Sequence, residues 1–469
     1  MTLFDTIEQL TLANNPTLST PAECLAKAGS PSTSIAILDD ATLSSRCYST
    51  VGDDTETIFQ ACSISKPVTA LAIMRLIDEG YFTLDSTIAE LLPSEILDIL
   101  TEDSPSAQKK IIASITVRQL MSHTAGLSVS GFVGYANGPY PTVQDILRGA
   151  YPANNLRVRL DALPGSGFSY SGGGITVLQI ILETVTKTDF PTLMQDKVLK
   201  PLGMTRSFFG ELPPREANAA ESHETGYTPS WTTHHFQPEY AAAGLWTTPT
   251  DLLKAVAAVQ RSLEKDDFLK KETAETMLTK LDKDSGIALS WFIAGENDTN
   301  FAHGGANVPG FRCMVVGFAE PGPKKSGIAV MTNSSEGTDV LWRVCLAAAY
   351  LKKWPLVASI PSLKMVTPLW DMNAVVGNGW RDYLGTWTDG KGEYRVGEED
   401  GRPVLWWNGF GPVKLLPGAV PDSVNEGGVC CFVLDGLKLM LRLKGDGDEK
   451  VLVLENGLKK DTTDLKRSP

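Results

Sequence analysis

The stretch Phe59-Gln-Ala-Cys-Ser-Ile-Ser-Lys-Pro67 stands at the head of a strongly apolar run, Val68 to Gly80. This run predicts a buried helix, in which residues three apart lie on the same face. Ser63 and Lys66 have this spacing, so the lysine amine can reach the serine hydroxyl. A serine hydroxyl becomes a good nucleophile only when a neighbouring base takes its proton, and a lysine in apolar surroundings can be that base.

The Ser-x-x-Lys spacing is weak evidence by itself, because a second copy occurs at Ser262-Leu-Glu-Lys265. We interpret that copy as the solvated face of a helix that begins near Thr250. The corresponding structural alternative for Ser63 is a helix N-cap with Lys66 exposed. Two further motifs, in a fixed order along the chain, favour the catalytic interpretation.

The second motif is Phe168-Ser-Tyr-Ser-Gly-Gly-Gly174, which precedes an apolar helix, Ile175 to Val185. The third is His303-Gly-Gly-Ala-Asn-Val-Pro-Gly310, which precedes a strand-like run, Phe311 to Phe318. The order Ser-x-x-Lys, Tyr-Ser-x, then a basic residue followed by small residues resembles that of the serine β-lactamase and penicillin-binding-protein family. The chain is similar to the class C branch, which includes D-peptidases, carboxylesterases and transesterases.

The resemblance covers about residues 25 to 350. Leu120-Met-Ser-His-Thr-Ala-Gly-Leu127 resembles the end of a family helix, and Asp85 lies in a turn similar to the family's Gly-x-Leu-x-Leu-Asp. Ala243-Gly-Leu-Trp-Thr-Thr-Pro-Thr-Asp251 is similar to the loop and helix that precede the last catalytic strand. The resemblance implies an α+β fold, in which an antiparallel sheet packs on a helical subdomain.

The resemblance also implies a role for each motif residue. Ser63 is expected to be the acylated nucleophile, Lys66 its base or proton shuttle, and Tyr170 a second proton-transfer residue near both. His303 takes the place of the Lys-Thr-Gly triplet of many relatives. The backbone N–H groups of Ser63 and Ala306 are expected to form the oxyanion hole.

A second triplet, Lys325-Ser-Gly327, also resembles Lys-Thr-Gly, but it lies between two strand-like runs and is typical of a hairpin tip. We therefore expect His303 to be the functional residue, the alternative being a strand-end histidine bonded to the backbone. Gly304 and Gly305 leave room for a substrate along the strand edge. Tyr240 and Trp246 are expected to contact the substrate as well.

Gly172 is the main departure from the family pattern. Class C β-lactamases and peptidoglycan peptidases have an asparagine there, whose amide holds the amide side chain of the substrate. A glycine removes that contact and is expected to open volume beside Tyr170. We therefore expect Gly172 to favour an ester or an undemanding amide over a β-lactam.

The remaining histidines have simpler interpretations. His123 is expected to brace a helix end. The polar residues 205–240 are expected to form a long loop. His223, His234 and His235 lie in it without the spacing typical of zinc ligands, so we expect a solvated loop. We expect no metal and no cofactor, because no phosphate loop or dinucleotide fingerprint precedes a helix.

Composition limits the partners and the location. The 469 residues carry a net charge of −13 at pH 7, which argues against nucleic acid and anionic membranes as partners. No apolar run is long enough for a membrane span, and the first residues do not resemble a secretory signal. The seven cysteines are odd in number and lack metal-like spacing, so we expect buried free thiols and a cytoplasmic location. The sequence leaves the oligomeric state open.

A change in composition and strand pattern along the sequence predicts two domains. Residues 1–360 are expected to form the catalytic domain, in which strands at both ends enclose helices. A hairpin is expected over residues 32–51, with its turn at Asp39-Asp-Ala, and a strand over 287–294. A Pro/Ser-containing connector follows, Pro355 to Pro368, and residues 370–469 then contain short strands between Gly/Asp turns. This last part is expected to be a small β-barrel similar to the lipocalin-like domain of some family members, with a generic β-sandwich as the alternative.

These observations predict a serine hydrolase that forms an acyl-enzyme on Ser63. The expected partner is a small-molecule ester or amide, as for a carboxylesterase or a D-peptidase/amidase. The alternative is a biosynthetic acyltransferase or transesterase, because the same residues serve when an alcohol or amine replaces water. A catalytically silent binding or scaffold protein is the second alternative.

Overall fold

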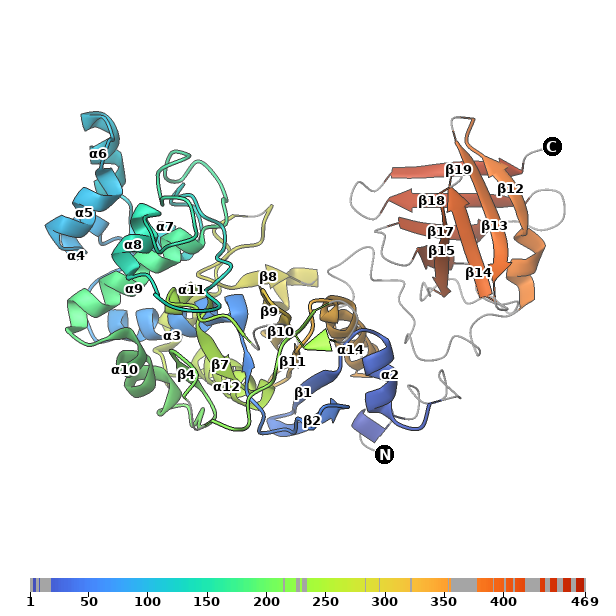
Figure 1. Cartoon of the computed structure of the whole chain (residues 1–469), viewed down its shortest axis with the longest axis horizontal. Helices are drawn as coiled ribbons and strands as arrows, with labels where there is room; N and C mark the ends of the chain where they lie inside the picture. The colour runs from blue at the N-terminus through green and yellow to red at the C-terminus, as the bar shows by residue number, and fades with distance from the viewer. Residues whose placement is uncertain are drawn as a thin grey trace. The chain divides into compact units, whose positions relative to one another are not determined.

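The computed structural model (Figure 1) describes most of the chain. The described residues are 3–5, 8, 18–213, 216–224, 228–229, 234–282, 284–294, 296–320, 323–352, 354–355, 378–390, 392–399, 402–407, 410–417, 431–434, 439–444, 450–456 and 461–467. The chain divides into two compact units, Leu25–Trp342 (the main unit) and Met1–Cys24 with Arg343–Pro469 (the second unit). The expected connector, 355–368, lies outside the described residues except for Pro355.

The main unit contains a six-stranded antiparallel sheet with strand order β2-β1-β11-β10-β9-β8. Its strands are β1 Ser32–Asp39, β2 Thr42–Ser49, β8 Phe292–Ala294, β9 Asn300–Asn307, β10 Phe311–Phe318 and β11 Gly327–Thr332. The hairpin expected near residues 32–51 is confirmed as β1 and β2. The strand expected over 287–294 is shorter, because Ser290 has a φ of 63° and the chain turns there, so that Ile287 forms a bridge with Phe292.

One long helix, α12 (Pro249–Glu264), packs on β1, β10 and β11. Its start is fixed by Thr248, whose side chain accepts a hydrogen bond from the backbone N–H of Asp251. A Cβ on Gly317 of β10 would lie only 2.6 Å from Cγ1 of Val256, so glycine allows the helix to approach the sheet closely. Helix α13, Lys271–Met277, contacts α12.

The helical part of the main unit follows the first two strands, as the sequence predicts. Its helices are α3 Ser65–Asp78, α4 Ile88–Leu91, α5 Ser94–Thr101, α6 Ser106–Ala113, α7 Val117–Met121, α8 Val143–Arg148, α9 Gly172–Thr186 and α10 Phe190–Met194. Figure 1 shows α4, α5 and α6 at the outer end of this group. The apolar faces of α3 and α9 are buried in the main hydrophobic core.

Two short elements connect the helices to the sheet. Helix α11, Tyr240–Ala243, contacts both α3 and α9. A three-stranded sheet has the order β3-β7-β4, formed by Phe59–Gln60, Leu245–Thr247 and Phe208–Phe209. A further pair joins β5, His223–Glu224, to β6, Thr228–Pro229. The part of the chain expected to be a long loop, residues 205–240, therefore contains short strands.

In its described residues the second unit contains eight antiparallel strands, each paired with the next along the chain, and β19 also pairs with β12. They are β12 Gly385–Thr388, β13 Glu393–Glu399, β14 Arg402–Trp407, β15 Phe410–Pro417, β16 Cys431–Leu434, β17 Leu439–Lys444, β18 Val451–Asn456 and β19 Asp461–Arg467. Trp387 is fully buried in their core, and its indole N–H donates to the Tyr383 carbonyl at 3.0 Å. The lipocalin-like relationship stays a prediction.

Two helices span the division between the units: α2, Pro21–Lys27, and α14, Gly337–Lys352. None of the described helices is long and apolar enough to cross a membrane. Of the described cysteines, Cys24, Cys62, Cys313 and Cys345 are buried and Cys47 is partly buried, all with free thiols.

Candidate active site

Ser63 lies in a tight turn between β3 and α3. The 3₁₀ turn Cys62–Ile64 joins these elements, and Cys62 has a φ of 52°, which is unusual for a residue with a side chain. The turn is held by Ser65, whose hydroxyl donates to the Cys62 carbonyl at 2.6 Å and accepts from the Leu245 N–H at 3.0 Å. Ser63 is partly exposed, whereas both of its neighbours are buried, so the turn presents its hydroxyl.

Lys66 reaches the serine as its spacing predicts. Its side chain is only 2% exposed, and Nζ donates to Ser63 Oγ at 3.0 Å and to the Ala242 carbonyl of α11 at 2.8 Å. Nζ also lies 5.0 Å from the ring centroid of Tyr170. The structure thus brings Ser63, Lys66 and Tyr170 together from segments a hundred residues apart in the chain.

His303 lies on β9 beside Tyr170, with 6.3 Å between the two ring centroids. Its Nδ1 donates to the Gly304 carbonyl at 2.6 Å. Burial and then the positive charge of Lys66 lower the pKa of His303 to about 3. The imidazole is therefore neutral at physiological pH.

His123 is a site residue that the sequence interpretation missed. It follows α7 with a φ of 57°, and its ring centroid lies 4.3 Å from that of Tyr170. The backbone N–H of Ser171 donates to His123 Nδ1 at 3.2 Å. Burial, followed by the charge on Lys66, lowers the pKa of His123 well below its usual value. The Ser-His-Thr segment was the available signal, but it indicated only a helix brace.

The glycines of the third motif bring β9 against the serine turn. A Cβ on Gly305 would lie 2.7 Å from the Ala61 carbonyl oxygen and 2.8 Å from Cys62 Cβ, closer than a side chain tolerates. This approach places Ala306, the next residue, near the turn that carries Ser63. Gly304 is less constrained, because its nearest neighbour would be Met314 Cε at 3.3 Å.

Asn307 joins the elements on both sides of the site, and the sequence interpretation gave it no role. Its Nδ2 donates to Gln60 Oε1 at 2.7 Å and to the Ala243 carbonyl at 3.4 Å. Gln60 in turn donates to the His235 carbonyl at 2.8 Å. Because Gln60 lies three residues before Ser63, these bonds fix β9 relative to the serine turn.

The space beside Gly172 is filled, which corrects the expectation of an open volume. A Cβ on Gly172 would lie 2.9 Å from Cε2 of Phe132 and 3.2 Å from the Ser130 carbonyl oxygen. The segment before Phe132 is held there by Gly173 N–H, which donates to the Val129 carbonyl at 3.0 Å. An aromatic ring therefore takes the place of a side chain at position 172.

The described ring contacts of Tyr240 and Trp246 are with aromatic residues outside the group of Ser63, Lys66 and Tyr170. Trp246 is 3% exposed, and its ring contacts His234 and Phe311 at centroid distances of 5.1 and 5.9 Å. The Tyr240 ring contacts Phe190 and Phe236. Among the described residues, no hydrogen bond or ring contact joins either one to Ser63, Lys66 or Tyr170, so their expected substrate contact stays a prediction.

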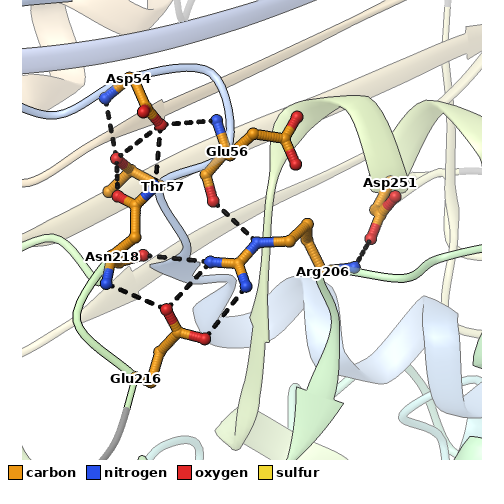
Figure 2. Close-up of polar contacts among 7 residues, drawn as sticks. All are labelled: Asp54, Glu56, Thr57, Arg206, Glu216, Asn218 and Asp251. Atoms are coloured by element: carbon orange, nitrogen blue, oxygen red, sulfur yellow. Dashed lines mark hydrogen bonds and ion pairs between the residues drawn. The ribbon is translucent and has the colours of Figure 1, made fainter.

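An ion-pair network supports the chain that leads into β3 (Figure 2). Arg206 forms two hydrogen bonds with the Glu216 carboxylate at 3.0 and 3.1 Å and donates to the Glu56 carbonyl at 3.0 Å. Asn218 donates to Asp54 at 3.0 Å, and the Arg206 backbone N–H donates to Asp251 of α12 at 2.9 Å. We interpret this network as structural, because its members bond to one another.

The two look-alike motifs lie outside the site. Ser262 is fully buried, and its hydroxyl donates to the Ala258 carbonyl at 2.8 Å, so the expectation of a solvated face was wrong for this residue. Lys325 lies between β10 and β11, which confirms the hairpin interpretation. A cavity of about 830 Å³ between α12, α13 and the β8–β10 edge is lined by none of the predicted site residues.

The chain is similar in sequence to a penicillin-binding protein and to an esterase. The chain is 26% identical over 153 residues to "Penicillin-binding protein 4" of Amycolatopsis lactamdurans, covering 33% of this chain and 36% of that protein. It is 30% identical over 162 residues to "Esterase EstB" of Burkholderia gladioli, covering 32% and 38%. The matches thus span little more than a third of each of these relatives.

A solved structure extends the similarity to the fold of nearly the whole chain. The octameric penicillin-binding protein homologue from Pyrococcus abyssi superposes with a TM-score of 0.60 at 20% identity, covering 95% of this chain and 98% of that one. Residues 22–343 of this chain match the family model described as Beta-lactamase, and a match over this much of the chain makes it a member of that family.

Proposed function

We propose that this protein is a serine hydrolase that forms an acyl-enzyme on Ser63 from an ester or amide of a small molecule. The observation that carries the proposal is the 3.0 Å hydrogen bond from buried Lys66 Nζ to the partly exposed Ser63 hydroxyl. As substrate binds, the Lys66 side chain, in its uncharged amine form, takes the hydroxyl proton and Ser63 Oγ attacks the carbonyl carbon. Tyr170 beside the ammonium is suited to pass that proton to the leaving group.

We assign roles to the other residues of the site from where they lie relative to Ser63. Backbone N–H groups of Ser63 and Ala306 stabilise the oxyanion, because β9 lies against the serine turn. His303 and the glycines after it line the strand edge along which the substrate lies. The Phe132 ring beside Gly172 favours an apolar acyl group over a β-lactam with an amide side chain, as does the similarity to an esterase. A scaffold protein has no use for a buried lysine that bonds an accessible serine.

Labelling with a fluorophosphonate, followed by intact-mass and peptide mass spectrometry, tests the proposal. One adduct is expected, on Ser63, and it should be lost in Ser63→Ala but retained in Ser262→Ala. Ser262 is the matched control because it has the same Ser-x-x-Lys spacing. An adduct that persists in Ser63→Ala would contradict the assignment. A panel of esters, amides and thioesters, read by mass spectrometry, then identifies the acyl donor.

A further inference from the structure

Two buried imidazoles contact Tyr170 within a group of neighbouring aromatic rings. His123 and His303 are 1% and 3% exposed. Around them the ring contacts run from His123 to Phe168 at 6.1 Å, from Phe168 to Phe292 at 6.1 Å and from Phe292 to His303 at 5.4 Å. The two histidines are therefore sheltered from bulk solvent on the side of the site next to Tyr170.

The backbone fixes His123 and His303 in opposite tautomers. A backbone N–H donates to His123 Nδ1, so that nitrogen is unprotonated and the neutral ring carries its proton on Nε2. His303 Nδ1 faces a carbonyl oxygen, so it must carry the proton and leave Nε2 as a bare acceptor. One ring thus offers a hydrogen-bond donor and the other an acceptor.

The second ring nitrogen of each histidine has no hydrogen-bond partner in the described part of the chain. Among the described residues, His123 Nε2 and His303 Nε2 are buried polar atoms without a hydrogen bond. Buried polar atoms are nearly always paired, so two unpaired ones of complementary type beside the proposed catalytic groups point to a ligand that completes both. Such a ligand must accept from His123 and donate to His303.

We propose that His123 and His303 hold the water that deacylates Ser63; this inference rests on the proposed function. A water has two lone pairs and two hydrogens. One lone pair accepts from His123 Nε2–H and one hydrogen is donated to His303 Nε2. The second lone pair stays free to attack the acyl carbon, and the second hydrogen stays free for the base. An alcohol lacks the second hydrogen and a primary amine lacks the second lone pair, so water alone satisfies all four positions.

The chemical step is balanced without an additional reactant. The water oxygen bonds to the acyl carbon, the bond from that carbon to Ser63 Oγ breaks, and the abstracted proton passes through Lys66 and Tyr170 to Ser63 Oγ. The products are a carboxylic acid and free serine. The imidazoles remain neutral throughout, because their task is to orient the water rather than to take its proton.

The tautomers can be measured directly by nitrogen NMR on protein labelled at histidine, which occurs five times in the chain. At pH 7, His123 is expected as the neutral Nε2–H form and His303 as the neutral Nδ1–H form. Signals are assigned by their loss in His123→Asn and His303→Asn. A protonated ring, or the opposite tautomer at either position, would overturn the inference.

Kinetics separate the water site from the nucleophile. Asparagine mimics Nδ1 of histidine, so His123→Asn keeps the bond to Ser171 N–H and loses only the Nε2 donor. With a chromogenic ester, the acylation burst is expected to stay within a few fold, while steady-state turnover falls about tenfold or more. When methanol is added, the ratio of methyl ester to carboxylic acid product should be higher for His123→Asn than for the unmodified protein. His235→Asn, whose Nδ1 bonds only the Val133 carbonyl in the described structure, is the matched control and should change neither phase.

The outcomes distinguish the inferred water site from the proposed acyl-enzyme function on which it rests. Equal loss of burst and turnover in His123→Asn, or no loss, would contradict the water site while the Ser63 adduct stands. The absence of any burst or adduct in the unmodified protein would contradict the proposed function, and the water site with it.

Discussion

At the scale of single residues, Phe132 explains why position 172 has no side chain. The Phe132 ring and the Ser130 carbonyl lie where a Cβ on Gly172 would point. Overpacking of this kind typically costs about 1–3 kcal/mol unless the neighbour moves. The glycine that replaces the asparagine of β-lactamases is therefore accompanied by Phe132, whose ring fills the space. Substitutions at positions 172 and 132 should depend on each other.

Gly172→Asn is expected to lower kcat/KM for a short-chain chromogenic ester by about tenfold, because the new side chain must displace the ring. Gly172→Asn combined with Phe132→Ala should recover most of that loss. Gly131→Asn is the matched control, since a Cβ there meets nothing within 4 Å. Steady-state kinetics with this ester and a cephalosporin measure the preference of each variant for an ester over a β-lactam. Efficient cephalosporin turnover by the unmodified protein would refute the substrate argument.

At the scale of elements, the site depends on how β3, β9 and α11 are held together. Lys66 bonds α11 through Ala242, and Asn307 bonds both β3 and α11. These bonds are buried, so breaking one leaves a polar group without a partner at a cost of about 1–3 kcal/mol. The elements that carry the nucleophile, its base and the oxyanion donor thus share one hydrogen-bonded frame.

Asn307→Ala is expected to lower the free energy of unfolding by about 1–3 kcal/mol and kcat by about tenfold, because Gln60 loses its partner and the serine turn loosens. Gln60→Ala should do the same. The double variant should be less impaired than the sum of the two, since both remove one contact. Urea unfolding and ester kinetics measure the two effects. Strict additivity in this cycle would show that the frame does not couple these residues.

Local patterns predicted the elements around the three motifs, and long-range contacts explain what these patterns missed. The Ser63–Lys66 pair follows from helical spacing, and the β1–β2 hairpin from two strand-like runs joined by a turn. Asn307 could not be assigned, because its partner Gln60 is 247 residues away in sequence. His123 and Phe132 were missed for the same reason, since each acts through a residue of the Tyr170 motif. The predicted solvent exposure of Ser262 was wrong, because a helical pattern does not show which neighbouring residues cover the polar face of the helix.

At the scale of the whole molecule, the proposed catalytic residues and the main core belong to one compact unit. Ser63, Lys66, His123, Tyr170 and His303 all lie within Leu25–Trp342, as does the main hydrophobic cluster. The strands of the second unit have a separate core around Trp387. The main unit and the strands of the second unit therefore each bury apolar side chains in a core of their own, which is a physical requirement for independent stability.

Limited trypsin digestion tests whether the chain separates at the connector predicted from the sequence, which precedes the strands of the second unit. Lys364 lies in the Pro/Ser-containing connector predicted from the sequence, so cleavage there should give stable fragments of residues 1–364 and 365–469. The fluorophosphonate adduct is expected on the first fragment after cleavage, because its site needs only main-unit residues. Lys364→Gln is the matched control and should abolish this cut. Progressive digestion without a stable fragment would show that the two cores depend on each other, and a cleaved protein that no longer reacts with the phosphonate would show that residues 365–469 contribute to the site.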